Sequence, residues 1–257
     1  MTTASHTSSG ASTRGPADSF PDGADNPVLL RLGAASLVLG FLGQVPFGLL
    51  HPHAEDPNDS SAAFTEYGHS SDWVLVHLGQ FACALLVTFG LVVIATSLAR
   101  QRGLAGALAV FGALTAVTTT AVFAVQMAVD GIALKAAVDV WLSAAGEAEQ
   151  SAAFGVAEGI RATEKGLSAL FHLNNGLTLL TLGISIALGR RYPRWLGWVG
   201  ATVGAGFLAV GLLTAQTGFS PEATSLALPA TALLAAFVIG MSVALWRRAA
   251  RHDERVA

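Results

Sequence analysis

Three ionisable residues, Asp130, Lys135 and Asp139, follow directly on a long apolar segment. The 26 residues of that segment, 104–129, carry no charge. At a rise of about 1.5 Å per residue, a helix over the segment spans roughly 39 Å, more than the roughly 30 Å of a bilayer's hydrocarbon core. Asp130 is therefore expected at or just beyond the outer membrane boundary. Lys135 and Asp139 are four residues apart on a helix that continues into water, and we expect them to form an ion pair.

Further polar side chains recur in the outer half of the apolar segments, on the same side of the membrane as Asp130. Five of the six segments contribute one: Gln44, His77 with Gln80, Gln126 with Asp130, His172 with Asn174 and Asn175, and Gln216. Polar groups at this depth are costly unless they face one another, a cavity or backbone carbonyls. We expect an outward-facing polar pocket for a small molecule or an ion. The alternative is that these groups form hydrogen bonds between helices, each contributing about 0.6 kcal/mol to packing.

Several histidines have the chemistry of metal ligands. His51 and His53 flank a proline in an acidic loop, and together with His77 or His172 they could complete a nitrogen and carboxylate site for Zn or Cu. His77 and His172 could also act as axial ligands of a haem from two antiparallel helices. The alternative for the loop is a solvated acidic segment whose prolines and aspartates form turns. The spacing assigns no particular cofactor.

The elements that position these residues are transmembrane helices. Only 12% of the 257 residues are charged and 53% are hydrophobic, whereas soluble domains carry roughly 25% charged residues. Because the apolar runs are continuous and about twice as long as a tilted barrel strand, they indicate helices. The predicted fold is an all-α, polytopic bundle with spans at 32–50, 73–99, 104–129, 166–189, 195–219 and 226–246.

The distribution of charge predicts the orientation of the bundle. All the arginine clusters fall on one side of the membrane: Arg100 and Arg102, then Arg190, Arg191 and Arg194, then Arg247, Arg248, Arg251 and Arg255. The positive-inside rule therefore places both termini in the cytoplasm. Residues 1–27 are expected to be a disordered cytoplasmic tail, 28–248 the transmembrane domain, and 249–257 a basic cytoplasmic tail.

The sequence contains none of the common catalytic motifs, such as GxSxG, HExxH, Walker A or paired CxxC. It favours a protein that is not an enzyme. Nucleic acid is not an expected partner, because the arginine clusters are short and lie where membrane topology requires them. The expected partners are the lipid bilayer and a small molecule or ion, and the oligomeric state stays open.

Four segments resemble a group of actinobacterial six-helix membrane proteins that form a family of unknown function. They are EDPNDSSAAFTEY (55–67), WVLVHLGQF (73–81), AVDGIALKAAVDVW (128–141) and YPRWLGW (192–198). The resemblance covers roughly residues 28–220. It implies the same topology in a bacterial inner (plasma) membrane and suggests that Asp130, Lys135 and Asp139 belong together. It implies no activity.

Three functional hypotheses follow from the sequence. The first is a permease or sensor component that binds a ligand or ion in the outer pocket, with Asp130 and His77 as its ionisable pair. The second is a membrane redox protein that uses His77 and His172 for haem or metal. The third is a structural or assembly protein, in which the polar residues serve packing alone.

Overall fold

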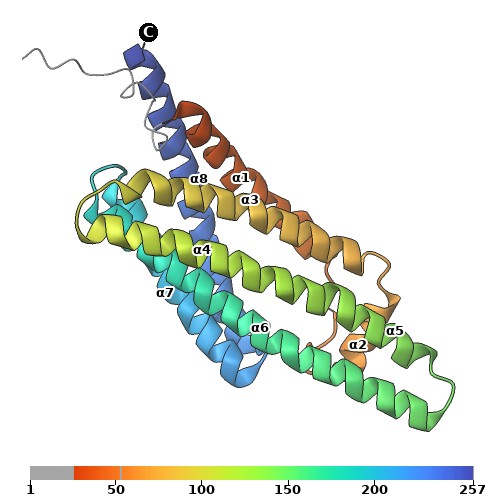
Figure 1. Ribbon diagram of the computed structural model, residues 1–257. Coiled ribbons are helices and arrows are strands. Elements are labelled where there is room, and N and C mark those ends of the chain that lie inside the picture. Colours follow the sequence, from red (N-terminus) through yellow and green to blue (C-terminus); the bar gives the residue numbers. More distant parts are fainter. Residues whose placement is uncertain (1–25, 53, 257) are drawn as a thin grey trace, which may run out of the picture.

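The computed structural model describes residues 26–52 and 54–256, and this part of the chain is helical without any strand (Figure 1). Six helices are long and apolar enough to cross a membrane. They are α1 (Pro27–Leu50), α3 (Trp73–Ala99), the continuous run of α4 (Leu104–Ala128), η3 (Val129–Leu134) and α5 (Lys135–Ser143), then α6 (Glu147–Leu188), α7 (Arg194–Thr217) and α8 (Pro221–Val256). A short helix, α2 (Ser60–His69), lies between α1 and α3.

The helix limits agree with the predicted spans in part. The second span, 73–99, coincides with α3. α1 starts earlier than predicted, at Pro27, because the Asn26 side chain accepts hydrogen bonds from the backbone N–H groups of Val28 and Leu29. α8 continues through the basic segment predicted as a tail. Of the predicted tail 1–27, residues 1–25 lie outside the described residues.

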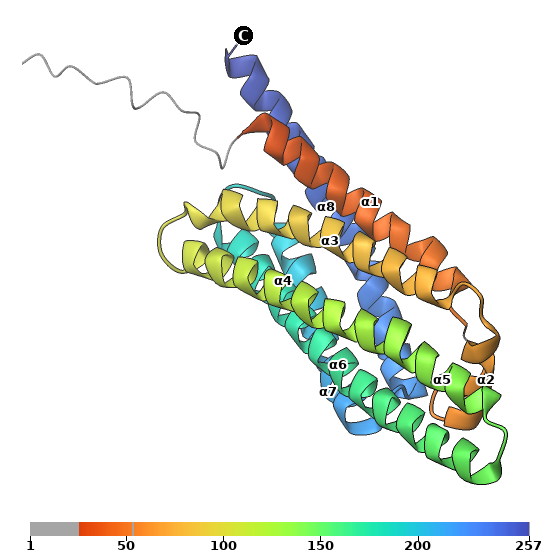
Figure 2. The same cartoon turned by 45° about the vertical axis from the view of Figure 1, so that its right-hand side comes forward.

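The six spanning helices form a closed ring. Each packs against two neighbours in the order α1, α3, α4, α6, α7, α8 and back to α1, as the two views in Figures 1 and 2 also indicate. α6 and α7 approach most closely, because glycines face backbone across their contact. A Cβ atom on Gly183 would lie 2.3 Å from the Ala201 nitrogen, and one on Gly204 would lie 2.3 Å from the Leu180 nitrogen.

Two helical runs are much longer than a membrane is thick. The run 104–143 has 40 residues and α6 has 42, which correspond to roughly 60 Å and 63 Å. Both project at the end of the bundle where α2 lies, which we call the α2 end (Figure 2). There α2, η3, α5 and the beginnings of α3 and α6 form a second, smaller apolar core, which we call the cap. Its largest members are Phe64, Tyr67, Trp73, Leu134, Val138 and Trp141.

Candidate functional site

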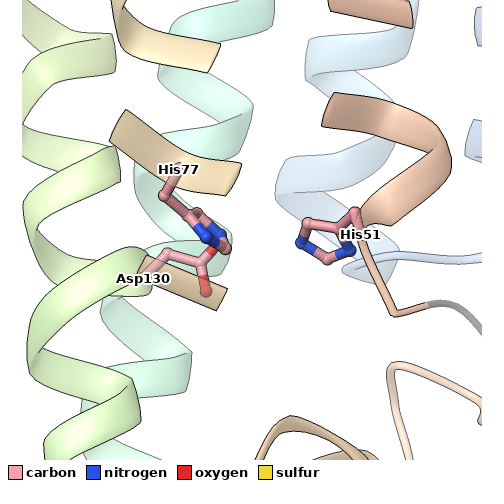
Figure 3. Close-up of side chains that lie close together, drawn as sticks. All are labelled: His51, His77 and Asp130. Atoms are coloured by element: carbon pink, nitrogen blue, oxygen red, sulfur yellow. The ribbon is translucent and has the colours of Figure 1, made fainter. Parts of the chain in front are cut away.

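Two histidines and an aspartate meet where the ring of helices joins the cap (Figure 3). His51 directly follows the last residue of α1, His77 lies in the second turn of α3, and Asp130 lies in η3. One ligand atom from each residue lies within 4.8 Å of the other two. His77 Nε2 is 2.9 Å from Asp130 Oδ2, and both side chains are almost completely buried. We call this group the His–His–Asp cluster.

Backbone carbonyls fix the orientation of both imidazole rings. His77 Nδ1 lies 2.7 Å from the Trp73 carbonyl oxygen, and His51 Nδ1 lies 2.8 Å from the Pro52 carbonyl oxygen. A carbonyl only accepts hydrogen bonds, so each Nδ1 carries a hydrogen and donates it. Nε2 is then the ring nitrogen with a lone pair in the neutral form of each histidine. Metal-binding histidines are held in the same way, with the second nitrogen donating to a carbonyl or carboxylate.

The aspartate is positioned by an irregular helix. η3 is a π-helical segment, whose backbone hydrogen bonds join residues five apart and not four apart as in the α-helices on either side, and such segments are frequent at functional sites. The indole N–H of Trp73 donates to the Asp130 carbonyl oxygen at 3.0 Å, which ties η3 to the start of α3. Gly131 allows the close approach of the two helices, because a Cβ there would lie 2.5 Å from His77 Cβ.

Asp130 keeps hydrogen-bonding capacity that the described part of the chain does not use. Its Oδ2 faces His77, whereas its Oδ1 is buried and has no hydrogen-bond partner among the described residues. A buried carboxylate oxygen without a partner is costly. A cation bound beside it would remove that cost.

A second set of polar residues is connected to the cluster through aromatic rings that pack against one another at tilted angles. The Trp73 ring lies 4.5 Å from the His77 ring and 4.2 Å from the Tyr67 ring, between centroids. Arg161 donates to the Tyr67 hydroxyl at 3.0 Å and pairs with the carboxylate of Glu164. Arg161 and Glu164 are only 4% and 3% exposed. The sequence alone suggests two charged residues in water, and only their i, i+3 spacing indicates that they form an ion pair.

Burial shifts the titration of the two groups of this region that lie outside the spanning helices. Desolvation lowers the pKa of His51 below its usual value of 6.5, and the hydrogen bond to Pro52 only partly opposes it. His51 is therefore neutral at pH 7, as a metal ligand must be. Desolvation raises the pKa of Tyr67 to about 12, so its hydroxyl stays protonated.

The remaining predicted residues of this end have other surroundings. Lys135 Nζ lies 2.5 Å from Asp139 Oδ1 and also donates to the Gly68 carbonyl oxygen at 3.3 Å, so this ion pair links α5 to α2. The Lys135–Asp139 ion pair therefore lies beside the cap and does not belong to the His–His–Asp cluster. His53 lies outside the described residues.

The other predicted pocket residues divide into three groups. Gln44, Gln80, His172 and Asn175 line one cavity of about 360 Å³ inside the ring of helices. Gln126 is buried, its Oε1 has no partner among the described residues, and it is not among the residues that line this cavity. Gln216 is exposed near the end of α7. The structure thus separates the predicted single pocket into the cluster and a cavity.

The two histidines of the predicted haem pair have different partners. His77 contacts Asp130 and lies against the rings of Trp73 and His51, with centroids 4.5 Å and 5.2 Å away. His172 lines the cavity and stacks on Phe207 with its centroid 5.8 Å away. The second histidine beside His77 is His51, one of the candidate metal ligands predicted with it, and His172 is not part of the cluster.

Comparison of the chain with protein-family models, curated proteins and solved structures finds no match. The function therefore has to be inferred from the residues of the site.

Proposed function

We propose that this chain is a multi-pass membrane protein that binds a divalent transition-metal ion, of the Zn²⁺ type, through His51, His77 and Asp130. The observation that carries the proposal is the convergence of these three side chains within 4.8 Å. The backbone carbonyls that hold both Nδ1–H groups and the unpartnered Asp130 Oδ1 add to it. Two imidazoles and one carboxylate suit Zn²⁺, Fe²⁺ or Mn²⁺, and three protein ligands leave at least one further position open.

The dimensions of the cluster fit an ion after a small adjustment. With bonds of about 2.0–2.1 Å, two ligand atoms on a tetrahedral Zn²⁺ lie about 3.3 Å apart. Without an ion, His77 Nε2 and Asp130 Oδ2 are closer than this, at 2.9 Å, because a proton shared between them forms a hydrogen bond, and a bound metal ion would replace that proton. The widest separation in the cluster is at most 4.8 Å. A movement of about 1 to 1.5 Å by His51, which follows the end of α1, closes that difference.

The orientation of the protein in its membrane is part of the same proposal. The arginine clusters between the helices support cytoplasmic termini in the plasma membrane of a bacterium, and this orientation exposes the α2 end to the outside. The ion would then exchange with the external medium. We also propose that the chain is related to the actinobacterial six-helix membrane proteins that segments 55–67, 73–81, 128–141 and 192–198 resemble. This relationship does not indicate an activity.

A second candidate function rests on the 2.9 Å contact between His77 and Asp130. A buried histidine and carboxylate at this distance can share and transfer a proton, as such pairs do in proton-coupled transporters. In that case the cluster binds protons and not a metal.

The experiment that tests the proposal is elemental analysis of the full chain, purified in a mild detergent without chelators and then titrated with Zn²⁺. We expect about one ion per chain in the wild type, and at least a tenfold weaker affinity in His51→Ala, His77→Ala and Asp130→Asn. His69→Ala is the matched control, because His69 is an exposed histidine of α2 outside the cluster. A wild type that binds Zn²⁺ no better than Asp130→Asn overturns the metal proposal and leaves the proton pair.

A further inference from the structure

The cavity inside the ring of helices is separate from the His–His–Asp cluster and has its own chemistry. Residues from α1, α3, α4, α6, α7 and α8 all line it. Along α3 its lining extends from Leu91 to Gln80, which lie roughly 12 Å and 29 Å from the end of that helix at Ala99. The cavity is therefore at the depth of the hydrocarbon core, and its volume of about 360 Å³ is in the range of small-molecule sites.

No Asp, Glu, Lys or Arg is among the described residues that line the cavity. A charged ligand at this depth would lack a counter-ion, and an unpaired buried charge is very costly. This excludes phosphates, carboxylates and metal cations as occupants. A molecule bound in this cavity would therefore be neutral.

Aromatic and polar groups lie together toward the α2 end of the cavity. The aromatic side chains are Phe41, Phe123, Phe171 and Phe207, and the Phe123 and Phe171 rings are 4.7 Å apart between centroids. Gln44, Gln80, His172 and Asn175 share this level by their positions along their helices. Rings of this kind bind a planar ring by stacking, and amide and imidazole groups bind its oxygen atoms.

One of these polar groups has an unused hydrogen-bonding atom. His172 Nδ1 is buried and has no partner among the described residues, although its ring is fixed by stacking on Phe207 with an interplanar angle of 5°. A buried polar atom of this kind needs a partner. A ligand oxygen or hydroxyl in the cavity would supply it.

We propose that this cavity binds a neutral, lipid-soluble molecule with a planar, oxygen-bearing ring of the quinone class. The ring lies among the phenylalanines, its oxygens bond to His172 and the amides, and an apolar substituent extends toward Leu91 and Ala116. The hydrocarbon depth of the site requires a ligand that partitions into the bilayer. The proposal does not depend on the metal centre, because it uses different residues.

The test measures equilibrium binding of duroquinone to the full chain in neutral detergent. We expect saturable binding in the wild type, at least tenfold weaker binding in His172→Leu, and equal weakening in Ala84→Phe, which fills the cavity. Gln216→Ala is the matched control, because it removes an exposed amide that does not line the cavity. Thr88→Phe replaces Ala84→Phe if the latter does not elute as a single species.

Two further comparisons make the result specific. 2-Hydroxymethylanthraquinone should bind and anthraquinone-2-sulfonate should not, because the two share a ring and differ in charge. Duroquinone affinity should be the same with and without a metal chelator, which separates this proposal from the metal site. Binding that is equal in the wild type, His172→Leu and Ala84→Phe, or absent from the wild type, overturns the proposal.

Discussion

Replacement of Gly131 by alanine tests whether the approach of η3 to α3 builds the His–His–Asp cluster. A Cβ at this position would lie 2.5 Å from His77 Cβ and 2.8 Å from His77 Cγ. Carbon atoms in contact need about 3.5–4.0 Å, so the helices must separate by about 1 Å. The same displacement stretches the 2.9 Å contact between His77 and Asp130 to about 3.9 Å, which is no longer a hydrogen bond.

The magnitude follows from two opposing effects. Overpacking of this kind costs about 1–3 kcal/mol, whereas a glycine-to-alanine change inside a helix gains about 1 kcal/mol. We therefore expect a net loss of about 0–2 kcal/mol in the free energy of unfolding. Metal affinity should be more sensitive than stability. Disturbing the groups that orient metal ligands lowers the affinity by about tenfold to 100-fold.

The assay is denaturant unfolding in detergent together with a Zn²⁺ competition titration, applied to Gly131→Ala and to Gly159→Ala. Gly159 is a matched control, since it is exposed in α6 and no atom lies within 4 Å of its added Cβ. Gly159→Ala should retain full Zn²⁺ affinity and gain up to about 1 kcal/mol. Equal Zn²⁺ affinity in the two variants would refute the reasoning that this contact holds the ligands.

Three other perturbations have defined outcomes. Because burial lowers the pKa of His51, the stability that its neutral form contributes is complete above about pH 6.5 and is lost as the pH falls through its folded-state pKa. Between pH 7.5 and 5, the melting temperature of the metal-free protein should therefore fall less in His51→Gln than in the wild type. Tyr67→Phe removes the acceptor for Arg161 and should cost about 1–2 kcal/mol in denaturant unfolding, and an unchanged midpoint would show that water replaces the hydroxyl. Gly204→Val presses on the Leu180 backbone and should cost at least about 2 kcal/mol; unfolding like the wild type would contradict the close packing of α6 and α7.

The fold was largely predictable from the sequence because apolar length is a strong signal. The six uncharged runs are continuous and too long for barrel strands, so helices are the arrangement that satisfies their backbone in lipid, and α3 ends where the run 73–99 ends. The predicted limits are too short where helices continue into water, as in α6, which starts at Glu147 and not at 166. Outside the membrane, a polar helix has the same composition as a loop. Only the contacts with the cap show that these residues are helical.

The candidate site was predictable only in its parts. Helical rise placed His77 and Asp130 near the same depth, and the structure brings them into contact. Depth carries no information about which helices are neighbours, so it could not separate His172 and Asn175 from the cluster. The sequence named His51 as a possible ligand with either His77 or His172, but it could not choose between these two pairs, because the choice depends on where α1 ends and on how the ring of helices closes.

The π-helical segment η3 makes the His–His–Asp cluster sensitive to chain length at one place. Relative to an uninterrupted α-helix, η3 holds one additional residue between α4 and α5. Deletion of one residue, for example the exposed Ile132, would restore a regular α-helix. A π turn of five residues rotates about as far as an α turn of four, so α5 would keep nearly the same orientation and Val138 and Trp141 would stay in the cap. Asp130, in contrast, would lose the irregular backbone that positions it. In the evolution of this chain, loss of one codon here would therefore damage the cluster more than the fold.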